Sequence, residues 1–421
     1  MKVKFVDLAA QNLEIAERVA FELDLVHSNT AYVGGVQVES FEREFAEFLN
    51  VKRVVGVANG TDALRIALLA LDIGPGDEVI TVPMTFIATA AAIVQTGARP
   101  SFVDIDPATG NMSVAALRSY LESRSANERR AIRAIVPVHL YGLPASIAEL
   151  KEVAAEFNLK VVEDACQAHG ARVRTVGGMA MAGTLGDVGC FSFYPGKNLG
   201  AWGDGGAVAT NDEEVARRVS LLSNHGRLSH YAHEICGYNS RLDSIQAAVL
   251  RAKLEKLAEW NERRRVVASA YRELLAPLDV RPILEPQGTE SCFHLFVIRS
   301  ARRDAIRNAL LQNEIECGIH YPVPLHLQPA LAYLGYRSGD FPASEALADT
   351  TLSLPMHPHL NGQEILRTVE TINRALAQAD EPLVMRHDAP ASAASASAAS
   401  ASVASASTAS PSAVNTRIAA A

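Results

Sequence analysis

Short, almost wholly apolar runs alternate with amphipathic segments through the first half of the chain. The apolar runs are typical of buried strands and cover residues 77–83, 99–106, 133–142, 159–166, 187–195 and 205–212. The segments between them repeat apolar residues at helical spacing and cover residues 59–73, 85–98 and 146–158. Apolar strands that alternate with helices predict an α/β fold, with a mainly parallel mixed sheet covered on both faces.

Two helices have particularly clear signals. In the helix that starts near residue 60, Thr61 or Asp62 can cap the first turn, because their side-chain oxygens accept from free backbone N–H groups. The Gly-Pro-Gly run at 74–76 would stop that helix. Residues 240–276 contain no glycine or proline. We therefore predict a long helix there, or two joined helices, leading out of the first domain.

A chain of 421 residues favours two domains. We predict a large domain over residues 1–250 and a smaller α+β domain over residues 251–385, which begins in the long helix. Residues 386–421 form an Ala/Ser-rich tail without aromatic residues and with almost no charge. Such a segment cannot bury enough apolar surface to offset its ordering entropy, so we predict that it is disordered.

The composition argues against several classes of function. The formal net charge of -8 and the lack of a basic stripe argue against a nucleic-acid partner. No apolar run approaches the roughly 18 residues of a membrane span, and the N-terminus lacks the apolar core of a signal peptide. The five cysteines show no CxxC spacing, which favours reduced thiols over a disulfide framework or a zinc site. We expect a soluble, cytoplasmic protein that binds no metal, nucleic acid or membrane.

One lysine stands in unusual surroundings. Lys197 follows the apolar run 187–195 in a turn-rich loop, among Phe193, Tyr194 and Trp202, with hardly another charge nearby. A desolvated amine with a lowered pKa can bond covalently to a carbonyl group, so we interpret Lys197 as the anchor of a cofactor. Taken alone, a lysine on a surface turn is the simpler explanation.

Asp164 ends the predicted strand 159–166, where a carboxylate is costly unless it meets a cation. A protonated pyridine nitrogen would be such a partner, and pyridoxal phosphate enzymes place an acid there to maintain an electron sink. The alternative is a carboxylate that caps nearby backbone. Because ligands bind beyond the carboxyl ends of parallel strands, we expect Asp164, Lys197 and Phe86 to meet at one sheet edge.

Further residues suit the same cofactor. Gly60 and Thr61 open a helix whose free N–H groups can seat a phosphate, and Ser192 offers a hydroxyl to it. Phe86 could cover a flat ring, and Gln167 could donate to a ring hydroxyl. Each also has an ordinary explanation: a helix cap, a strand serine, a core phenylalanine and a loop amide.

Several stretches together resemble the sugar aminotransferases of the DegT/DnrJ/EryC1/StrS family. The resemblance runs from about residue 5 to about residue 380, and its motifs lie at 59–68, 85–90, 161–171, 190–212 and 237–250. It implies the fold-type-I, aspartate-aminotransferase-like architecture and a homodimer with active sites at the subunit interface. It also implies pyridoxal 5'-phosphate as cofactor, with pyridoxamine 5'-phosphate as the intermediate form.

The resemblance assigns roles to individual residues. Lys197 would carry the cofactor, Asp164 would pair with its ring nitrogen, and Gln167 would approach its ring hydroxyl. The other expected contacts are Phe86 on the ring, Gly60, Thr61 and Ser192 on the phosphate, and Asn239 on the phosphate of the other subunit's cofactor. Considered without the family, Asn239 is a candidate helix cap before residues 240–250.

The expected reaction moves an amino group from L-glutamate to a nucleotide-linked keto sugar. The stretches 224–243 and 318–330 look most like members that aminate C3, with His320 and Tyr321 near the sugar or its diphosphate. A Pro-rigidified loop with incidental histidines explains the second stretch equally well.

Three alternatives stay open. The first is a 4-keto substrate, and the second is a dehydratase of the same family, whose members carry histidine in place of Lys197. The third is a non-catalytic regulatory protein. Two departures from the family pattern are Cys166, where alanine is usual, and the longer stretch 172–187. We expect the longer stretch to alter a surface loop; the alternative is that it reshapes the entrance to the site.

Overall fold

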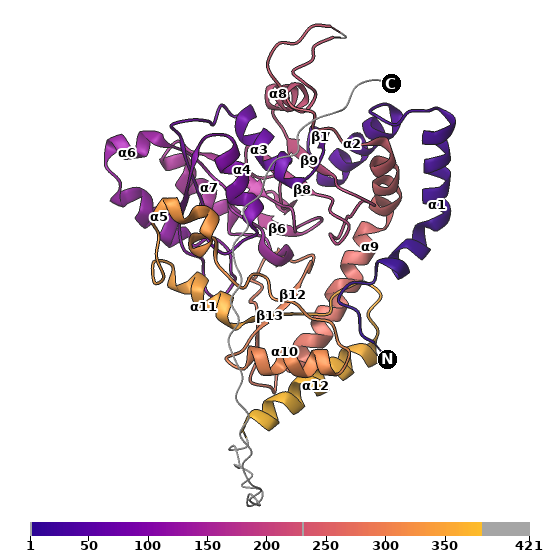
Figure 1. The fold of residues 1–421 in the computed structure, drawn as a ribbon, viewed down its shortest axis with the longest axis vertical. Helices are drawn as coiled ribbons and strands as arrows, with labels where there is room; N and C mark the ends of the chain where they lie inside the picture. The colour runs from indigo at the N-terminus through magenta and orange to yellow at the C-terminus, as the bar shows by residue number, and fades with distance from the viewer. Residues whose placement is uncertain (1, 230, 381–421) are drawn as a thin grey trace, which may run out of the picture. The chain divides into compact units, whose positions relative to one another are not determined.

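A computed structural model describes residues 2–229 and 231–380 and has a seven-stranded sheet at its centre (Figure 1). The strands lie in the order β1-β9-β8-β5-β4-β2-β3. Their bounds are β1 Arg53–Val57, β2 Glu78–Thr81, β3 Arg99–Phe102, β4 Ile132–Ile135, β5 Lys160–Asp164, β8 Val188–Ser192 and β9 Gly206–Thr210. Only β9 runs antiparallel to its neighbours in this sheet. The prediction of an α/β fold with a mainly parallel mixed sheet is confirmed.

Helices cover both faces of this sheet, as the apolar strands require. One face packs against α3 (Gly60–Ala70), α4 (Ile87–Gln95) and α8 (Glu213–Ser223). The other packs against α5 (Val114–Ser123), α7 (Ile147–Glu156), α2 (Val36–Leu49) and the long helix α9 (Ser244–Leu275). Side chains alternate along the extended chain, so Val188 and Cys190 enter the first core while Phe191 and Phe193 enter the second. The short helix α6 (Ala126–Ala131) precedes β4.

The first turn of α3 differs from the prediction. Asn59 caps this helix, and its Oδ1 atom accepts a hydrogen bond from the Asp62 backbone N–H at 2.8 Å. The expectation that Thr61 or Asp62 is the cap was therefore wrong, because the helix already begins at Gly60. The helix also ends at Ala70, before the Gly-Pro-Gly run. The cap leaves the N–H groups of Gly60 and Thr61 at the open end of the helix.

The predicted long helix is confirmed as the single, unbroken α9. Its side chains contact α1 (Leu8–Ser28) and α2, where Arg251 forms ion pairs with Glu22 at 2.7 Å and with Glu44 at 2.8 Å. The helix begins with Asp243 as its N-cap, so the interpretation of Asn239 as the cap was wrong. The predicted boundary at residue 250 lies inside α9, and the division into two domains stays a prediction.

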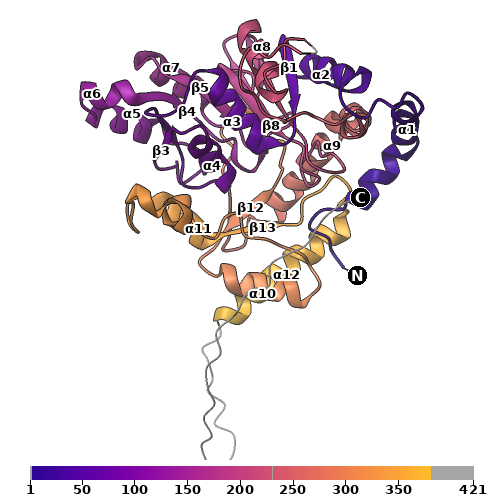
Figure 2. The same ribbon diagram turned by 45° about the horizontal axis from the view of Figure 1, so that its top comes forward.

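The C-terminal elements build a second sheet with its own core, below the large sheet in both ribbon views (Figures 1 and 2). This sheet has the order β10-β12-β13. The elements are β10 Arg281–Pro282, β12 Phe296–Arg299, α10 Arg303–Gln312, α11 Pro342–Thr350, β13 Thr351–Leu354 and α12 Gly362–Asp380. The predicted tail, residues 386–421, lies outside the described residues.

Short elements complete the fold. The stretch 172–187 contains the hairpin β6 (Arg172–Thr175) and β7 (Gly178–Met181), which pairs with β11 (Thr289–Glu290). The 3₁₀ turns in the described part of the chain are η1 Leu140–Gly142, η2 Leu325–Leu327 and η3 Pro329–Leu334. Within the described residues, no helix combines the length and apolar character that crossing a membrane requires.

Candidate active site

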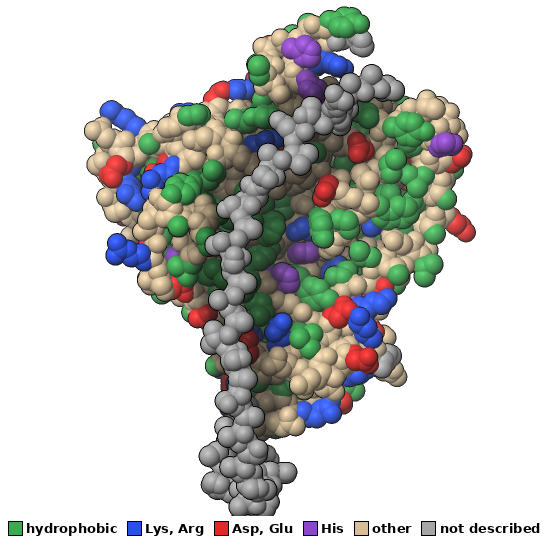
Figure 3. All heavy atoms as spheres, in the orientation of Figure 1, with side chains coloured by type: hydrophobic (Ala, Val, Ile, Leu, Met, Phe, Trp, Pro, Cys, Tyr) green, Lys and Arg blue, Asp and Glu red, His purple; other side chains and the backbone are tan. Residues whose placement is uncertain are grey.

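A cavity of about 650 Å³ opens beyond the carboxyl ends of β5 and β8. Nine of the predicted site residues line it: Gly60, Thr61, Phe86, Asp164, Gln167, Ser192, Lys197, His320 and Tyr321. On the face of the molecule in Figure 3, histidine side chains are visible near the middle as well as at the top and the right edge. The structure therefore brings together, at one sheet edge, residues that are far apart in the sequence.

Lys197 reaches this cavity from the loop after β8. Its backbone N–H donates to the Tyr194 carbonyl oxygen at 2.8 Å, and its side chain is half-buried. Among the described residues, no hydrogen bond or ion pair engages the amine. Burial lowers the pKa of Lys197 below its ordinary value, and the nearby Cys166 and Asp164 oppose that shift. A lysine in this environment is suited to attack a carbonyl group, because more of it is in the neutral form.

Asp164 is buried at the end of β5, with its carboxylate facing the cavity. Its Oδ2 atom accepts a hydrogen bond from the Thr89 hydroxyl at 2.8 Å, and its Oδ1 atom accepts one from the Cys166 backbone N–H at 3.2 Å. The second contact is the backbone cap that the sequence left open as an alternative. No cation pairs with this carboxylate among the described residues, so a positively charged ligand group would find it available.

The open end of α3 forms one wall of the cavity. Gly60 and Thr61 lie there next to Ser192. A β-carbon on Gly60 would lie 2.5 Å from the Ser192 Cβ and 3.1 Å from the Cys166 Sγ, so only glycine fits this position. Free N–H groups and the positive end of the helix dipole make this wall suitable for a phosphate.

Gln167 is held by hydrogen bonds on both sides of its amide. Its Oε1 atom accepts from the Tyr141 backbone N–H at 2.7 Å, and its Nε2 atom donates to the Tyr321 hydroxyl at 3.1 Å. The Tyr141 hydroxyl donates to the His320 carbonyl oxygen. The Tyr321 ring lies 5.8 Å from the Phe86 ring, at the exposed side of the cavity. Tyr141, which sequence reasoning missed, thus links the β5 edge to the loop that carries His320.

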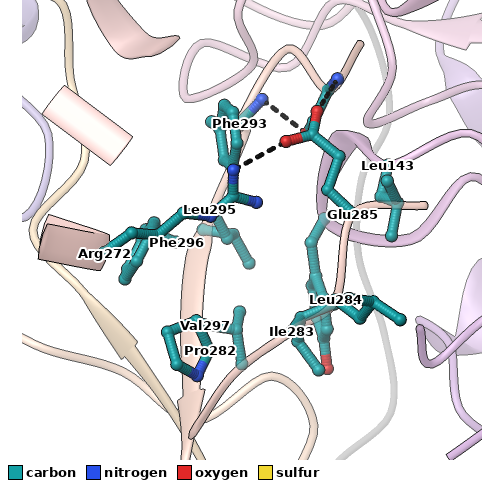
Figure 4. Close-up of a pocket in the computed structure, with 12 residues that line it drawn as sticks. Leu143, Arg272, Pro282, Ile283, Leu284, Glu285, Phe293, Leu295, Phe296 and Val297 are labelled. Atoms are coloured by element: carbon teal, nitrogen blue, oxygen red, sulfur yellow. Dashed lines mark hydrogen bonds and ion pairs between the residues drawn. The ribbon is translucent and has the colours of Figure 1, made fainter. Parts of the chain in front are cut away.

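Tyr141 also borders a much smaller cavity of about 20 Å³, enough for one water molecule (Figure 4). Figure 4 shows Arg272 directed at Glu285 across this space, with an ion pair of 2.8 Å. Glu285 also accepts from the Ser291 backbone N–H at 2.7 Å. This cavity is too small for a cofactor, and its polar groups are already paired.

His294 is a second residue that sequence reasoning missed. Asn198 donates through its side-chain nitrogen to the Asn261 Oδ1 at 2.9 Å and to the Cys292 carbonyl oxygen at 2.8 Å. The Asn198 Oδ1 atom is then left as the acceptor, and the His294 Nδ1 atom lies 3.3 Å from it. Burial, and next the charge of Lys197, hold the pKa of His294 well below its usual range. When the neutral His294 ring donates from Nδ1, its lone pair lies on Nε2. His294 also lines the cavity.

His320 lines the same cavity. Its Nδ1 atom lies 2.9 Å from the Ser353 hydroxyl, and its ring stacks on Phe5 at 5.8 Å. Burial, assisted by the charge of Lys197, lowers the pKa of His320 to about 4, so its ring is neutral at pH 7. Neutral histidine can donate and accept hydrogen bonds with a polar ligand such as a sugar.

Asn239 is the exception among the predicted site residues. It is exposed and pairs with Asn224 in an isolated bridge, and it does not line the cavity of its own chain. A role toward a second subunit stays a prediction. No group of histidine, cysteine, aspartate and glutamate side chains in residues 2–229 and 231–380 could hold a metal ion.

The cavity fits pyridoxal phosphate in three independent respects. Lys197 offers an unpaired amine for the aldehyde, and Asp164 offers the ring nitrogen a carboxylate that forms no ion pair among the described residues. The end of α3, where a side chain on Gly60 would clash, leaves a space lined by N–H groups for the phosphate.

Comparisons with known proteins agree with this geometry. The sequence profile of the DegT/DnrJ/EryC1/StrS aminotransferase family matches residues 14–373. A UDP-N-acetyl-3-dehydro-alpha-D-glucosamine 3-aminotransferase from Acidithiobacillus ferrooxidans is 41% identical, over 89% of this chain and 98% of that protein. A dTDP-3-amino-3,4,6-trideoxy-alpha-D-glucose transaminase from Streptomyces venezuelae is 42% identical, over 90% of this chain and 98% of that protein. The crystal structure of S. venezuelae DesV in complex with a ketimine intermediate matches with a TM-score of 0.85 and 40% identity, over 90% of this chain and 99% of that chain.

Proposed function

The chain belongs to the DegT/DnrJ/EryC1/StrS aminotransferase family, and from this premise we propose that it transfers an amino group to C3 of a nucleotide-linked 3-keto sugar. It is a pyridoxal phosphate-dependent enzyme with the fold-type-I architecture. The observation that carries the proposal is the unpaired amine of Lys197, which shares one cavity with the Asp164 carboxylate and the open end of α3.

The cofactor, when bound, would supply an electron sink for the electron pair left at the α-carbon of the amino donor when that carbon loses its proton. Lys197 would hold its aldehyde covalently, and Asp164 would keep its ring nitrogen protonated. The N–H groups of Gly60 and Thr61 would bind its phosphate together with the Ser192 hydroxyl. Once released, the Lys197 amine would remove a proton from the α-carbon of the amino donor and return it at C4'. Its lowered pKa suits this task, because a general base must be neutral before it accepts a proton.

We take L-glutamate as the amino donor and the keto-sugar nucleotide as the acceptor. Both relatives named above act at the 3-position, one on a UDP-linked and the other on a dTDP-linked sugar. The neutral ring of His320 and the hydroxyl of Tyr321 face the cavity, where they can hydrogen-bond to a sugar or its diphosphate.

We further propose that the enzyme works as a homodimer. Phe86 and Tyr194 line the cavity yet expose 53% and 60% of their surfaces. Apolar surface of this kind at a site that must exclude water is suited to cover by a second chain. Asn239, exposed and away from its own cavity, would reach the phosphate in the partner's site.

The test is a panel of UDP- and dTDP-linked 3-keto and 4-keto sugars with glutamate as donor, read by product mass. We expect amino sugars from 3-keto substrates and 2-oxoglutarate in equal amount. Lys197→Ala should abolish the reaction and the covalent trapping of cofactor by borohydride, whereas Cys236→Ala, a change at an exposed thiol, should do neither.

Each other outcome of the panel has a distinct meaning. Turnover of only 4-keto sugars would move the reaction to C4. A product that has lost water instead of gaining nitrogen would identify a dehydratase. A protein that never takes up pyridoxal phosphate would rule out the proposed enzyme.

A further inference from the structure

Two buried threonines, Thr85 and Thr89, line the cavity close to the Asp164 carboxylate. Thr89, in the first turn of α4, donates from its hydroxyl to the Asp164 Oδ2 at 2.8 Å. The Thr85 hydroxyl lies 3.2 Å from the Thr89 hydroxyl. The exposed fractions of Thr85, Thr89 and Asp164 are 2%, 1% and 5%. Water therefore cannot easily replace either hydroxyl as a hydrogen-bond partner.

The direction of these hydrogen bonds follows from the number of protons available. A hydroxyl group has one proton, and an ionised carboxylate can only accept. If Asp164 is ionised, Thr89 must give its proton to the carboxylate, and Thr85 must then donate to Thr89. The three side chains form a one-way chain of donors that ends on Asp164. A chain of this kind strengthens its last bond, because each hydroxyl polarises the next.

We propose that Thr85 and Thr89 are positioning residues that hold the Asp164 carboxylate oriented toward the ring nitrogen of the cofactor. The inference rests on the proposed function for the identity of the cofactor. It assigns to α4 a second task besides packing: its first turn presents a hydroxyl donor to the carboxylate. Neither threonine needs to contact the substrate for this role.

The geometry also shows why this support is needed. No side chain among the described residues forms an ion pair with Asp164, although Lys197 lies nearby, and its Oδ1 atom accepts from the Cys166 backbone N–H at 3.2 Å. The Cys166 thiol beside the carboxylate is only a weak donor. A buried carboxylate held by too few donors is costly in the free state. The threonine chain supplies a donor on the Oδ2 side and leaves the carboxylate free to face the ring.

The experiment compares Thr89→Val with Thr81→Val as a matched control. Thr81 is fully buried in β2, but its hydroxyl donates to the Val136 carbonyl oxygen at 2.8 Å and not to Asp164. The affinity for pyridoxal phosphate is measured by titrating each apoprotein. The protonation of the ring nitrogen is followed by NMR in holoenzymes that carry ¹⁵N-labelled cofactor, across a pH series. Neither measurement requires turnover.

We expect Thr89→Val to weaken cofactor binding about tenfold to hundredfold, as the loss of a hydrogen bond to a charged group implies. Its ring nitrogen should lose its proton at lower pH than in the wild type, because a less firmly held carboxylate stabilises the ring cation less. Thr89→Ser should restore both values, and Thr81→Val should change neither. Thr85→Val, which removes only the second donor, should cause a smaller change of the same kind; it serves as the test if Thr89→Val does not fold.

The inference is overturned if Thr89→Val binds cofactor and titrates like the wild type, or if Thr81→Val shifts the ring nitrogen as much as Thr89→Val does. Either result leaves the proposed function intact. A wild-type protein that fails to bind pyridoxal phosphate would instead overturn the proposed function, and this inference with it.

Discussion

At the scale of single residues, Gly60 is fixed by the space around it. A β-carbon there would press on Ser192 at 2.5 Å and on Cys166 at 3.1 Å. Gly60→Ala should therefore displace the first turn of α3 and weaken pyridoxal phosphate binding at least about tenfold, since the displaced N–H groups no longer face the phosphate. Gly74→Ala is the control, because a β-carbon at that position meets its nearest neighbour at an ordinary 3.6 Å. Equal affinities in the two variants would contradict the assignment of the phosphate seat.

His169 ties the stability of the protein to pH. It is fully buried against Phe191 and Phe193, and burial, followed by the charge of Lys197, lowers its pKa to about 3. The unfolded chain binds a proton at about pH 6.5, whereas the folded chain does so only near pH 3. Stability is thus lost as the pH falls below about 6.5, by about 1.4 kcal/mol for each pH unit from this residue.

The test is the free energy of unfolding of the wild type and of His169→Phe between pH 7 and pH 5. The variant lacks the titrating ring, so the difference in stability between the two proteins should change in its favour by about 1.4 kcal/mol per pH unit on acidification. Parallel pH curves for the two proteins would show that His169 does not titrate on unfolding.

At the scale of secondary-structure elements, Arg251 joins three helices. From α9 it pairs with Glu22 on α1 and with Glu44 on α2, and it donates to Gln37 at 2.7 Å. Glu22 is almost completely buried, so Arg251→Met should lower the free energy of unfolding by about 3 kcal/mol, because Arg18 would be the one cation left to pair with Glu22 within residues 2–229 and 231–380. Urea denaturation measures this loss. Arg118→Met, which breaks an exposed pair with Glu156, should have a much smaller effect.

Six strands of the central sheet could be predicted because their apolar runs are long enough to be buried on both faces, but the seventh, β1 at Arg53–Val57, was missed. The antiparallel direction of β9 could not, since Gly206–Thr210 is as apolar as its parallel neighbours and carries no mark of direction. The hairpin of β6 and β7 was also missed, because four-residue strands around Gly177 and Gly178 look like a surface loop. The cap of α3 was misplaced by a few residues because Asn59, Thr61 and Asp62 are all good cap residues.

The part of the candidate site that could be predicted consists mainly of residues at or just after the ends of strands. Phe86, Asp164 and Lys197 follow from the rule that ligands bind at the carboxyl edge, and the family resemblance added His320 and Tyr321. Tyr141 and His294 were missed, because their places depend on hydrogen bonds to residues that are 26 and 96 positions away in sequence. Such partners leave no local pattern.

At the scale of the whole molecule, the proposed homodimer can be tested by mixing two defective proteins. Lys197→Ala lacks the amine of its own site, and Asn239→Ala would lack the contact given to the partner's site. A hybrid dimer then has one intact site and one with both defects. Random reassembly should restore about a quarter of the wild-type activity. A mixture that shows only the average of its two parents would contradict a shared site.

The unbroken helix α9 has a consequence for how this enzyme could be adapted to new substrates. Asn261 on α9 accepts from Asn198, the neighbour of Lys197, and three residues later Arg264 donates to the carbonyl oxygens of Phe293 and Met356. Helix α9, about 48 Å long at 1.5 Å per residue, thus anchors both the loop that carries the Lys197 amine and the C-terminal core. Laboratory selection for altered sugar preference should accordingly recover substitutions in α9 and in the residues packed against it, although these residues do not contact the substrate.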